Sequence, residues 1–336
     1  MMCGDYAQEL DFECLLIHHL CLFVHIEVHM DVLAEILDSV KMHGDVFLRC
    51  AFAGPWIMEI GQKKVAEFHL IVAGHCYIAI QGFTVPVCLE PGDIVLFPNG
   101  HAHVLLDSPD TQASDASLIA PETLPENLEL LTVGEGTEPV SMLCGYFSFD
   151  HAGHSALMQA LPDFIHIKGE LLSGDFPWLK NTVEFINFEA EHFRPGTSAV
   201  INRLVEVLFV QILRAYITTS NQSAGLLGAI ADVRLGRALK AMHKTPEHAW
   251  TLEMLANRAG MSRSAFAAGF LAQVGQTPMQ YLTEWRMHKA KTMLQGSHSG
   301  IGDIAERCGY QSESSFSKAF KKQFGVSPGS FRKTSK

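Results

Sequence analysis

The sequence contains no apolar run that matches the length of a membrane span. The run at residues 15–26 is too short and is interrupted by histidines, and acidic residues precede it where a secretion signal carries positive charge. The eight cysteines show neither the paired spacing of zinc sites nor the density of secreted disulfide scaffolds. Membrane-spanning and secreted classes are therefore excluded, and we expect a protein of the reducing cytoplasm.

Basic residues are also scarce, with 25 Lys and Arg against 36 Asp and Glu and a net charge of −11. Their distribution is uneven, because residues 241–336 hold 13 Lys and Arg against 6 Asp and Glu. This segment is basic, whereas the remainder of the chain is strongly acidic. The overall acidity therefore does not exclude a nucleic-acid partner.

A helix-turn-helix pattern occurs twice in this basic segment, at residues 251–270 and 300–320. In each copy a small alanine suits a close helix crossing, a glycine suits a left-handed turn, and a serine suits the cap of the second helix. Paired phenylalanines at four-residue spacing predict an apolar stripe on that second helix. The matched positions are Ala256 with Ala305, Gly260 with Gly309, Ser262 with Ser312, Phe266 with Phe316 and Phe270 with Phe320.

The face opposite the phenylalanines is predicted to contact DNA, in two successive major grooves about 34 Å apart. Hydroxyls and cations on such a face suit phosphates and base edges. The alternative is a pair of ordinary helical hairpins with a solvated lysine face. The predicted contacts are Arg263, Ser264 and Ala267 in the first copy, and Ser312, Ser314, Ser317, Lys318, Lys321 and Lys322 in the second.

Residues 250–331 resemble the DNA-binding domain of the AraC/XylS family of bacterial transcription regulators. The resemblance rests on MetSerArgSer at the first recognition helix, on TyrLeuThrGluTrpArg in the connecting helix, and on GlyTyrGlnSerGluSerSerPhe in the second unit. The family commonly has a basic residue where this chain has Ala268, whereas Lys318 fits the equivalent position in the second unit. Arg286 matches a family arginine, and we expect it to contact phosphate or to form a surface salt bridge.

The first half of the chain predicts a small β-barrel. Short apolar runs punctuated by Gly and Pro lie between residues 46 and 106 and predict antiparallel strands, and the polar stretch 107–141 predicts a long solvated loop. Gly92, Pro98, Gly100 and His103 fit the second cupin motif, so the segment resembles the cupin sensor domain of some AraC-type regulators. The expected fold class is α+β, with an N-terminal cupin-type barrel and an all-α double helix-turn-helix domain.

The barrel offers two candidate sensor sites. Glu67, His69 and His103 could hold a metal, but the paired histidines of the first cupin motif are missing, and lone barrel histidines more often anchor loops. Cys50 and Cys144 lie where redox-responsive relatives, including a reactive-chlorine sensor, carry cysteines; the alternative is a pair of buried apolar thiols. A metal-dependent cupin enzyme fused to a DNA-binding tail is the rival function; the preferred one needs no catalysis and no cofactor.

The sequence therefore predicts a transcription regulator whose barrel senses a small molecule or an oxidant. Its expected partners are double-stranded promoter DNA, RNA polymerase, the effector and a second copy of the chain. An apolar stripe at residues 196–216 either packs on the barrel or forms that dimer interface. The expected segments are a non-native or disordered leader at 1–29, the sensor barrel at 30–150, a helical linker at 151–230 and the DNA-binding domain at 231–336.

Overall fold

The computed structural model describes residues 32–334 except 41, 121–128, 150–157, 159–160, 193 and 220–224. The leader predicted at residues 1–29 lies outside this part of the chain. None of the helices within it is long and apolar enough to span a membrane.

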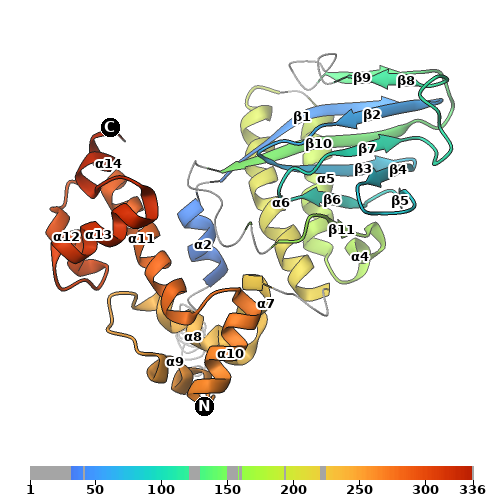
Figure 1. The fold of residues 1–336 in the computed structure, drawn as a ribbon. Helices are drawn as coiled ribbons and strands as arrows, with labels where there is room; N and C mark the ends of the chain where they lie inside the picture. The colour runs from blue at the N-terminus through green and yellow to red at the C-terminus, as the bar shows by residue number, and fades with distance from the viewer. Residues whose placement is uncertain are drawn as a thin grey trace, which may run out of the picture.

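Two β-sheets form the N-terminal half of the structure (Figure 1). Their inner faces enclose a core that includes Phe52, Trp56 and Phe97, all almost completely buried. The first sheet has the order β11-β6-β3-β10-β1-β9, with β1 (Met42–Phe52), β3 (Ala66–Ala73), β6 (Ile94–Phe97), β9 (Leu130–Val133), β10 (Val140–Phe149) and β11 (Ile165–Ile167). The second has the order β5-β4-β7-β2-β8, with β2 (Trp56–Ile60), β4 (Cys76–Ile80), β5 (Val87–Leu89), β7 (His103–Leu106) and β8 (Ser117–Ile119).

The cupin-type barrel is confirmed, with two departures from a purely antiparallel pattern. β9 pairs with β1 and β8 pairs with β2 in parallel register, and both short strands come from the stretch predicted to be a loop. That prediction was wrong for residues 117–119 and 130–133. Both strands lie at sheet edges and are mostly exposed, so they lack the apolar alternation by which a buried strand is recognised.

Helices α4 (Gly169–Gly174), α5 (Pro177–Glu191) and α6 (Thr197–Thr219) follow the barrel. Helix α6 lies so close to β1 that a Cβ at Gly44 would come within 2.7 Å of the Val205 side chain. The predicted stripe of residues 196–216 is divided: Leu208 and Ile212 are buried, whereas Val200 and Val207 are exposed. One face of α6 therefore packs on the barrel, and apolar side chains remain on another.

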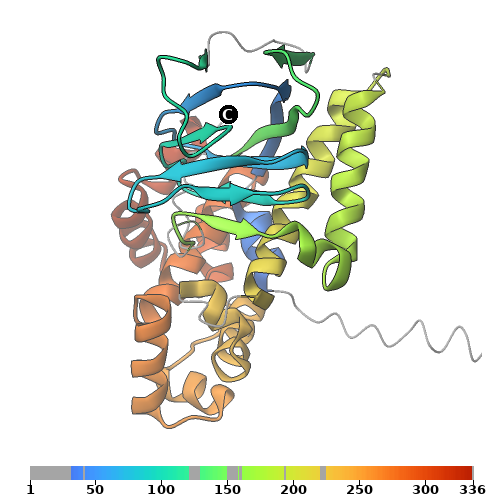
Figure 2. The same ribbon diagram turned by 90° about the vertical axis from the view of Figure 1, so that its right-hand side faces the viewer.

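The C-terminal half is entirely helical, as predicted, and its long helix α11 joins two smaller helical groups (Figures 1 and 2). Phe266 and Phe270 belong to the core of the first group, whereas Phe316 and Phe320 belong to that of the second. The helices are α7 (Gly225–Ala231), α8 (Val233–Lys244), α9 (Leu252–Ala259), α10 (Arg263–Val274), α11 (Pro278–Gly296), α12 (Ile301–Arg307), α13 (Glu313–Phe324) and α14 (Pro328–Thr334).

One further helix, α2 (Val32–Val40), connects the two halves. It directly precedes strand β1 of the barrel, yet it contacts α8 and α11 of the C-terminal half (Figure 1). Its buried residues Val32, Leu33 and Ile36 form the apolar part of this contact. The barrel and the helix-turn-helix module therefore meet through the first described helix of the chain.

Candidate nucleic-acid interface and sensor site

The two helix-turn-helix units share the predicted caps. The Ser262 hydroxyl accepts a hydrogen bond from the Ala265 N–H at 3.3 Å, and the Ser312 hydroxyl accepts one from the Ser315 N–H at 3.2 Å. Gly260 has φ +65° and Gly309 has φ +77°, the left-handed conformation that favours glycine. Both recognition helices, α10 and α13, therefore start from the same local geometry.

Buried phenylalanines fix each recognition helix to its unit. The rings of Phe266 and Phe270 lie 5.7 Å apart, those of Phe316 and Phe320 lie 5.9 Å apart, and all four side chains are inaccessible to solvent. Because these rings occupy one face of each helix, the opposite face is left at the surface. The predicted buried face of each recognition helix is confirmed.

Helix α13 presents a cationic surface. Ser314, Lys318, Lys321 and Lys322 are exposed and Ser317 is half-buried, and among the described residues these lysines form no ion pair. Their charges are therefore available to an anionic partner. The Ser312 hydroxyl is less available, because besides capping α13 it donates to the Ser315 hydroxyl at 2.9 Å.

Helix α10 presents a much less polar surface. Arg263 and Ser264 are exposed in its first turn, and Ala267 is half-buried. Farther along the helix Ala268 is exposed and Leu271 is 47% exposed. Polar contacts from α10 are therefore concentrated at its N-terminal end.

Arg286 lies on the connecting helix α11, against the turn before α9. Its Nε donates to the Pro246 carbonyl at 2.6 Å and its Nη2 donates to the His248 carbonyl at 2.8 Å. The sequence predicts a phosphate contact or a surface salt bridge, but these donors are bound to backbone carbonyls of the turn before α9. Burial lowers the pKa of the Arg286 guanidinium, which matches this enclosed position. A long-range contact with backbone leaves no sequence pattern, so it could not be foreseen.

In the barrel, the predicted sensor histidines are brought together. The Nε2 atoms of His69 on β3 and His103 on β7 lie 2.7 Å apart, and His103 Nδ1 lies 2.7 Å from the His101 carbonyl. Because a carbonyl only accepts, His103 Nδ1 carries a proton, and in the neutral pair His69 Nε2 donates to His103 Nε2. Burial lowers the pKa of His103 to about 4 and that of His69 well below its usual range.

Glu67 is buried two residues before His69 and on the same strand face. Its Oε1 accepts from the Lys63 ammonium at 2.6 Å, whereas Oε2 has no hydrogen-bond partner, and neither has His69 Nδ1. Burial raises the pKa of Glu67 despite Lys63. The described residues contain no group of three or more His, Cys, Asp or Glu side chains arranged to hold a metal ion.

Cys50 and Cys144 lie on neighbouring strands inside the barrel. Cys50 is opposite Met142 and Cys144 is opposite Leu48, so the two cysteines are diagonal neighbours. Diagonal positions are about 7–8 Å apart, farther than the Cα separation that most disulfides allow. Burial raises the pKa of Cys50 to about 12 and that of Cys144 well above its usual range. In this conformation both are buried, unreactive thiols.

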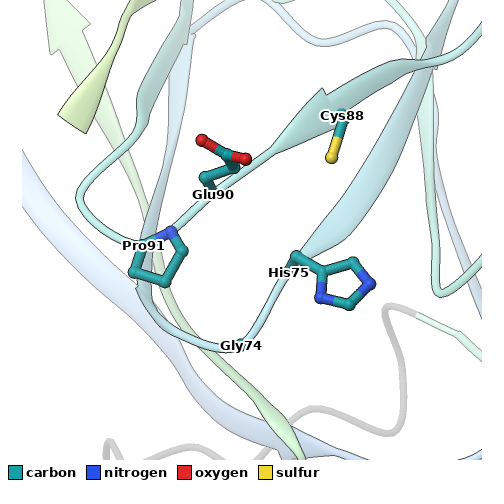
Figure 3. Close-up of a pocket in the computed structure, with 5 residues that line it drawn as sticks. All are labelled: Gly74, His75, Cys88, Glu90 and Pro91. Atoms are coloured by element: carbon teal, nitrogen blue, oxygen red, sulfur yellow. The ribbon is translucent and has the colours of Figure 1, made fainter. Parts of the chain in front are cut away.

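An open pocket of about 520 Å³ lies on the outside of the barrel, and Figure 3 shows the residues that line it. It is lined by the turn after β3 and by residues at the edge strand β5, namely Gly74, His75, Cys88, Glu90 and Pro91. Cys88 is an exposed thiol, unlike Cys50 and Cys144. Sequence reasoning missed this site, because a single cysteine on a short edge strand carries no motif.

The contact between α2 and the helix-turn-helix module contains a buried histidine, also unforeseen. The Glu35 carboxylate lies 3.7 Å from both His243 Nδ1 and Lys289 Nζ. His243 Nε2 lies 2.8 Å from the Tyr281 hydroxyl, and its ring centroid lies 4.0 Å from that of Trp285. Burial and the Lys289 charge lower the pKa of His243 to about 3. This histidine is therefore neutral in the folded protein at neutral pH.

Comparison with known proteins gives matches over nearly the whole chain. A cupin family model matches residues 31–218, and a helix-turn-helix domain model matches residues 255–334. HTH-type transcriptional regulator AlkR of Acinetobacter baylyi is 31% identical, covering 91% of this chain and 100% of its own length. HTH-type transcriptional regulator MtrA of Neisseria gonorrhoeae is 32% identical, with coverages of 90% and 98%. RCS-specific HTH-type transcriptional activator RclR of Escherichia coli is 28% identical, with coverages of 90% and 97%.

Proposed function

Because this chain belongs to the AraC-type transcription regulators with an N-terminal cupin domain, DNA-binding proteins and not cupin enzymes, we propose that α10 and α13 contact promoter DNA and that the barrel controls their presentation. The observation that carries the proposal is the cationic face of α13. Its lysines are exposed and unpaired within the described residues, directly opposite the buried Phe316 and Phe320.

The side chains of the two recognition helices suit different parts of DNA. Lys318, Lys321 and Lys322 suit phosphates, because lysine acts as a flexible point charge. Ser314 and Ser317 suit base edges, since hydroxyls donate and accept. In α10, base contacts are confined to Arg263 and Ser264, with Ala267 offering apolar contact to a thymine methyl group.

Lys318→Ala and Lys321→Ala test this interface. Each neutralised phosphate contact contributes about 0.9 to the slope of log affinity against log salt, so each substitution should lower the slope by about that amount. The measurement is a binding titration at several salt concentrations on an operator selected by the wild type. Lys64→Ala, an exposed lysine of the barrel, is the matched control. An unchanged slope in both α13 variants would remove these lysines from the interface.

We propose that the effector, a small molecule or an oxidant, acts inside the barrel. The candidate residues are the His69 and His103 pair, in which His69 Nδ1 has no hydrogen-bond partner, and Cys50 on β1 beside Cys144 on β10. β1 follows α2 in the chain, and α2 contacts α8 and α11. A change in the packing of β1 would therefore reach the helix-turn-helix module through α2. The signal must favour one arrangement of this contact over another.

An oxidant test separates the two sensor sites. Hypochlorous acid converts a thiol to a sulfenic acid and releases HCl, so wild type and the Cys50→Ala, Cys144→Ala double variant are compared on DNA before and after mild treatment. A response that the double variant loses and Cys88→Ala keeps supports the buried thiols. A response lost only in Cys88→Ala assigns it to the outer pocket, and no response directs attention to small molecules bound near His69 and His103.

We further propose a cytoplasmic homodimer that contacts RNA polymerase at its promoters. Helices α5 and α6 support the dimer, because they leave large apolar side chains exposed on the barrel's helical layer: Phe185, Phe188, Val200 and Val207. Sedimentation equilibrium of wild type and a Phe185→Glu, Val207→Glu variant tests it. A wild type that remains monomeric at micromolar concentration contradicts the proposal.

A further inference from the structure

The two helix-turn-helix units approach each other around Arg286. Arg286 from α11 donates to the carbonyls of Pro246 and His248, in the turn that leads into α9 of the first unit. The same guanidinium faces Gly309, in the turn before α13 of the second unit. The arginine therefore lies between the turns of both units, on the helix that joins them.

Gly309 shows how tight this junction is. A Cβ at this position would lie 2.6 Å from the Glu247 carbonyl oxygen and 2.9 Å from Arg286 Nη2. Gly260, its equivalent in the first unit, has the same left-handed conformation, but a Cβ there would meet nothing within 4 Å. Backbone conformation alone accounts for Gly260, whereas Gly309 is also required by the close approach of the two units.

We infer that Arg286, seated against Gly309, is a positioning residue that fixes the spacing and relative orientation of α10 and α13. This inference rests on the proposed two-groove binding and deepens it. The planar guanidinium can hold two carbonyls at fixed directions, which a lysine cannot. Without it, α11 would still pack on α8 through Tyr281 and Trp285 but would lose its two hydrogen bonds to the turn at residues 245–250.

Spacing selectivity follows from this geometry. Moving two half-sites by one base pair shifts them by about 3.4 Å along DNA and rotates one by roughly a tenth of a turn. A rigid pair of recognition helices cannot follow both changes, whereas a loosely joined pair can. The quantity that reports the positioning role of Arg286 is therefore the ratio of the affinities for correctly and incorrectly spaced sites.

The experiment uses the full chain and an operator selected from random DNA by the wild type. Affinity is measured on this operator and on versions with one base pair inserted or deleted between the half-sites. The wild type should lose affinity on the order of tenfold when the spacing changes. Arg286→Ala should bind the selected operator more weakly and lose less than about twofold on the altered spacing, with Arg286→Lys intermediate.

The glycine pair provides a matched control. Gly309→Ala should reduce the spacing penalty as Arg286→Ala does, whereas Gly260→Ala carries the same backbone strain and should keep the wild-type penalty. Because the penalty is a ratio measured on one preparation, partial unfolding of a variant cancels. A wild-type penalty in both Arg286→Ala and Gly309→Ala overturns the inference. Failure of the wild type to select any operator contradicts the proposed function instead.

Discussion

Acidification is expected to weaken the folded helix-turn-helix module through His243. This side chain is fully buried, and its Nε2 lies 2.8 Å from the Tyr281 hydroxyl. The groups that face it are Glu35 from α2 and Lys289, Trp285 and Tyr281 from α11. Burial and Lys289 lower its pKa to about 3. The folded state therefore binds a proton at His243 more weakly than the unfolded chain does.

The sign and size follow from proton linkage. A histidine in the unfolded chain has a pKa of about 6.5, so below that pH the unfolded state binds more protons than the folded state. The free energy of unfolding therefore decreases as the pH decreases. Between about pH 7.5 and pH 5.0, this one group should lower the free energy of unfolding by about 2 kcal/mol. The assay is urea unfolding of wild type and His243→Gln at both pH values. The difference between the two pH values should be smaller in the variant by about 2 kcal/mol.

Other buried histidines do not confuse this comparison. His69, His103 and His288 also have lowered pKa values, but they are present in both proteins and cancel. His298→Gln, at an exposed histidine of the same module, is the matched control for the substitution itself. Equal pH dependence in wild type and His243→Gln would refute the assignment of a neutral buried histidine at this contact.

Three further outcomes are expected. Iodoacetamide at neutral pH should label exposed Cys88 far faster than buried Cys50 or Cys144, as read by peptide mass spectrometry; equal rates would show that the barrel opens readily. Phe320→Ala should lower the free energy of unfolding by about 3–5 kcal/mol, because the ring is fully buried, and a loss below 1 kcal/mol in urea titrations would contradict that role. Ala268→Lys should steepen the salt dependence of DNA binding by about 0.9 if this exposed position faces phosphate, and no change would place it away from DNA.

Local chemistry explains why much of the DNA-binding half was predictable. The Ser262 and Ser312 caps, the glycine turns and the phenylalanine stripes all act within a few residues, so the sequence displays them directly. The repeat also defined which face of each recognition helix is buried. The barrel was predictable for a related reason, since its central strands carry apolar side chains and the turns between them contain Gly and Pro.

Contacts between distant segments were not predictable. Arg286 binds carbonyls about forty positions away, and backbone acceptors carry no residue-specific signal. The stripe on residues 196–216 showed that a helix is amphipathic but not which surface covers it, and the structure divides it between the barrel and solvent. The sequence did not predict edge strands β8 and β9, because they are held by pairing with a neighbouring strand and not by burial of their own side chains.

The contact between α2 and the module has the composition of an interface that can be released. Its apolar part consists of a few aliphatic side chains, whereas Glu35 Oε2, His243 Nδ1 and Trp285 Nε1 are buried without hydrogen-bond partners. A buried polar atom without a hydrogen bond costs about 1–3 kcal/mol, so His243 Nδ1 and Trp285 Nε1 offset part of the gain from apolar burial, whereas Glu35 Oε2 has its ion pair with Lys289. Separation of α2 would return the Glu35 carboxylate to water and remove it from His243 and Lys289. Under the proposed signalling through β1, a change in the barrel would shift the balance between docked and free α2 if it favours one of these two states.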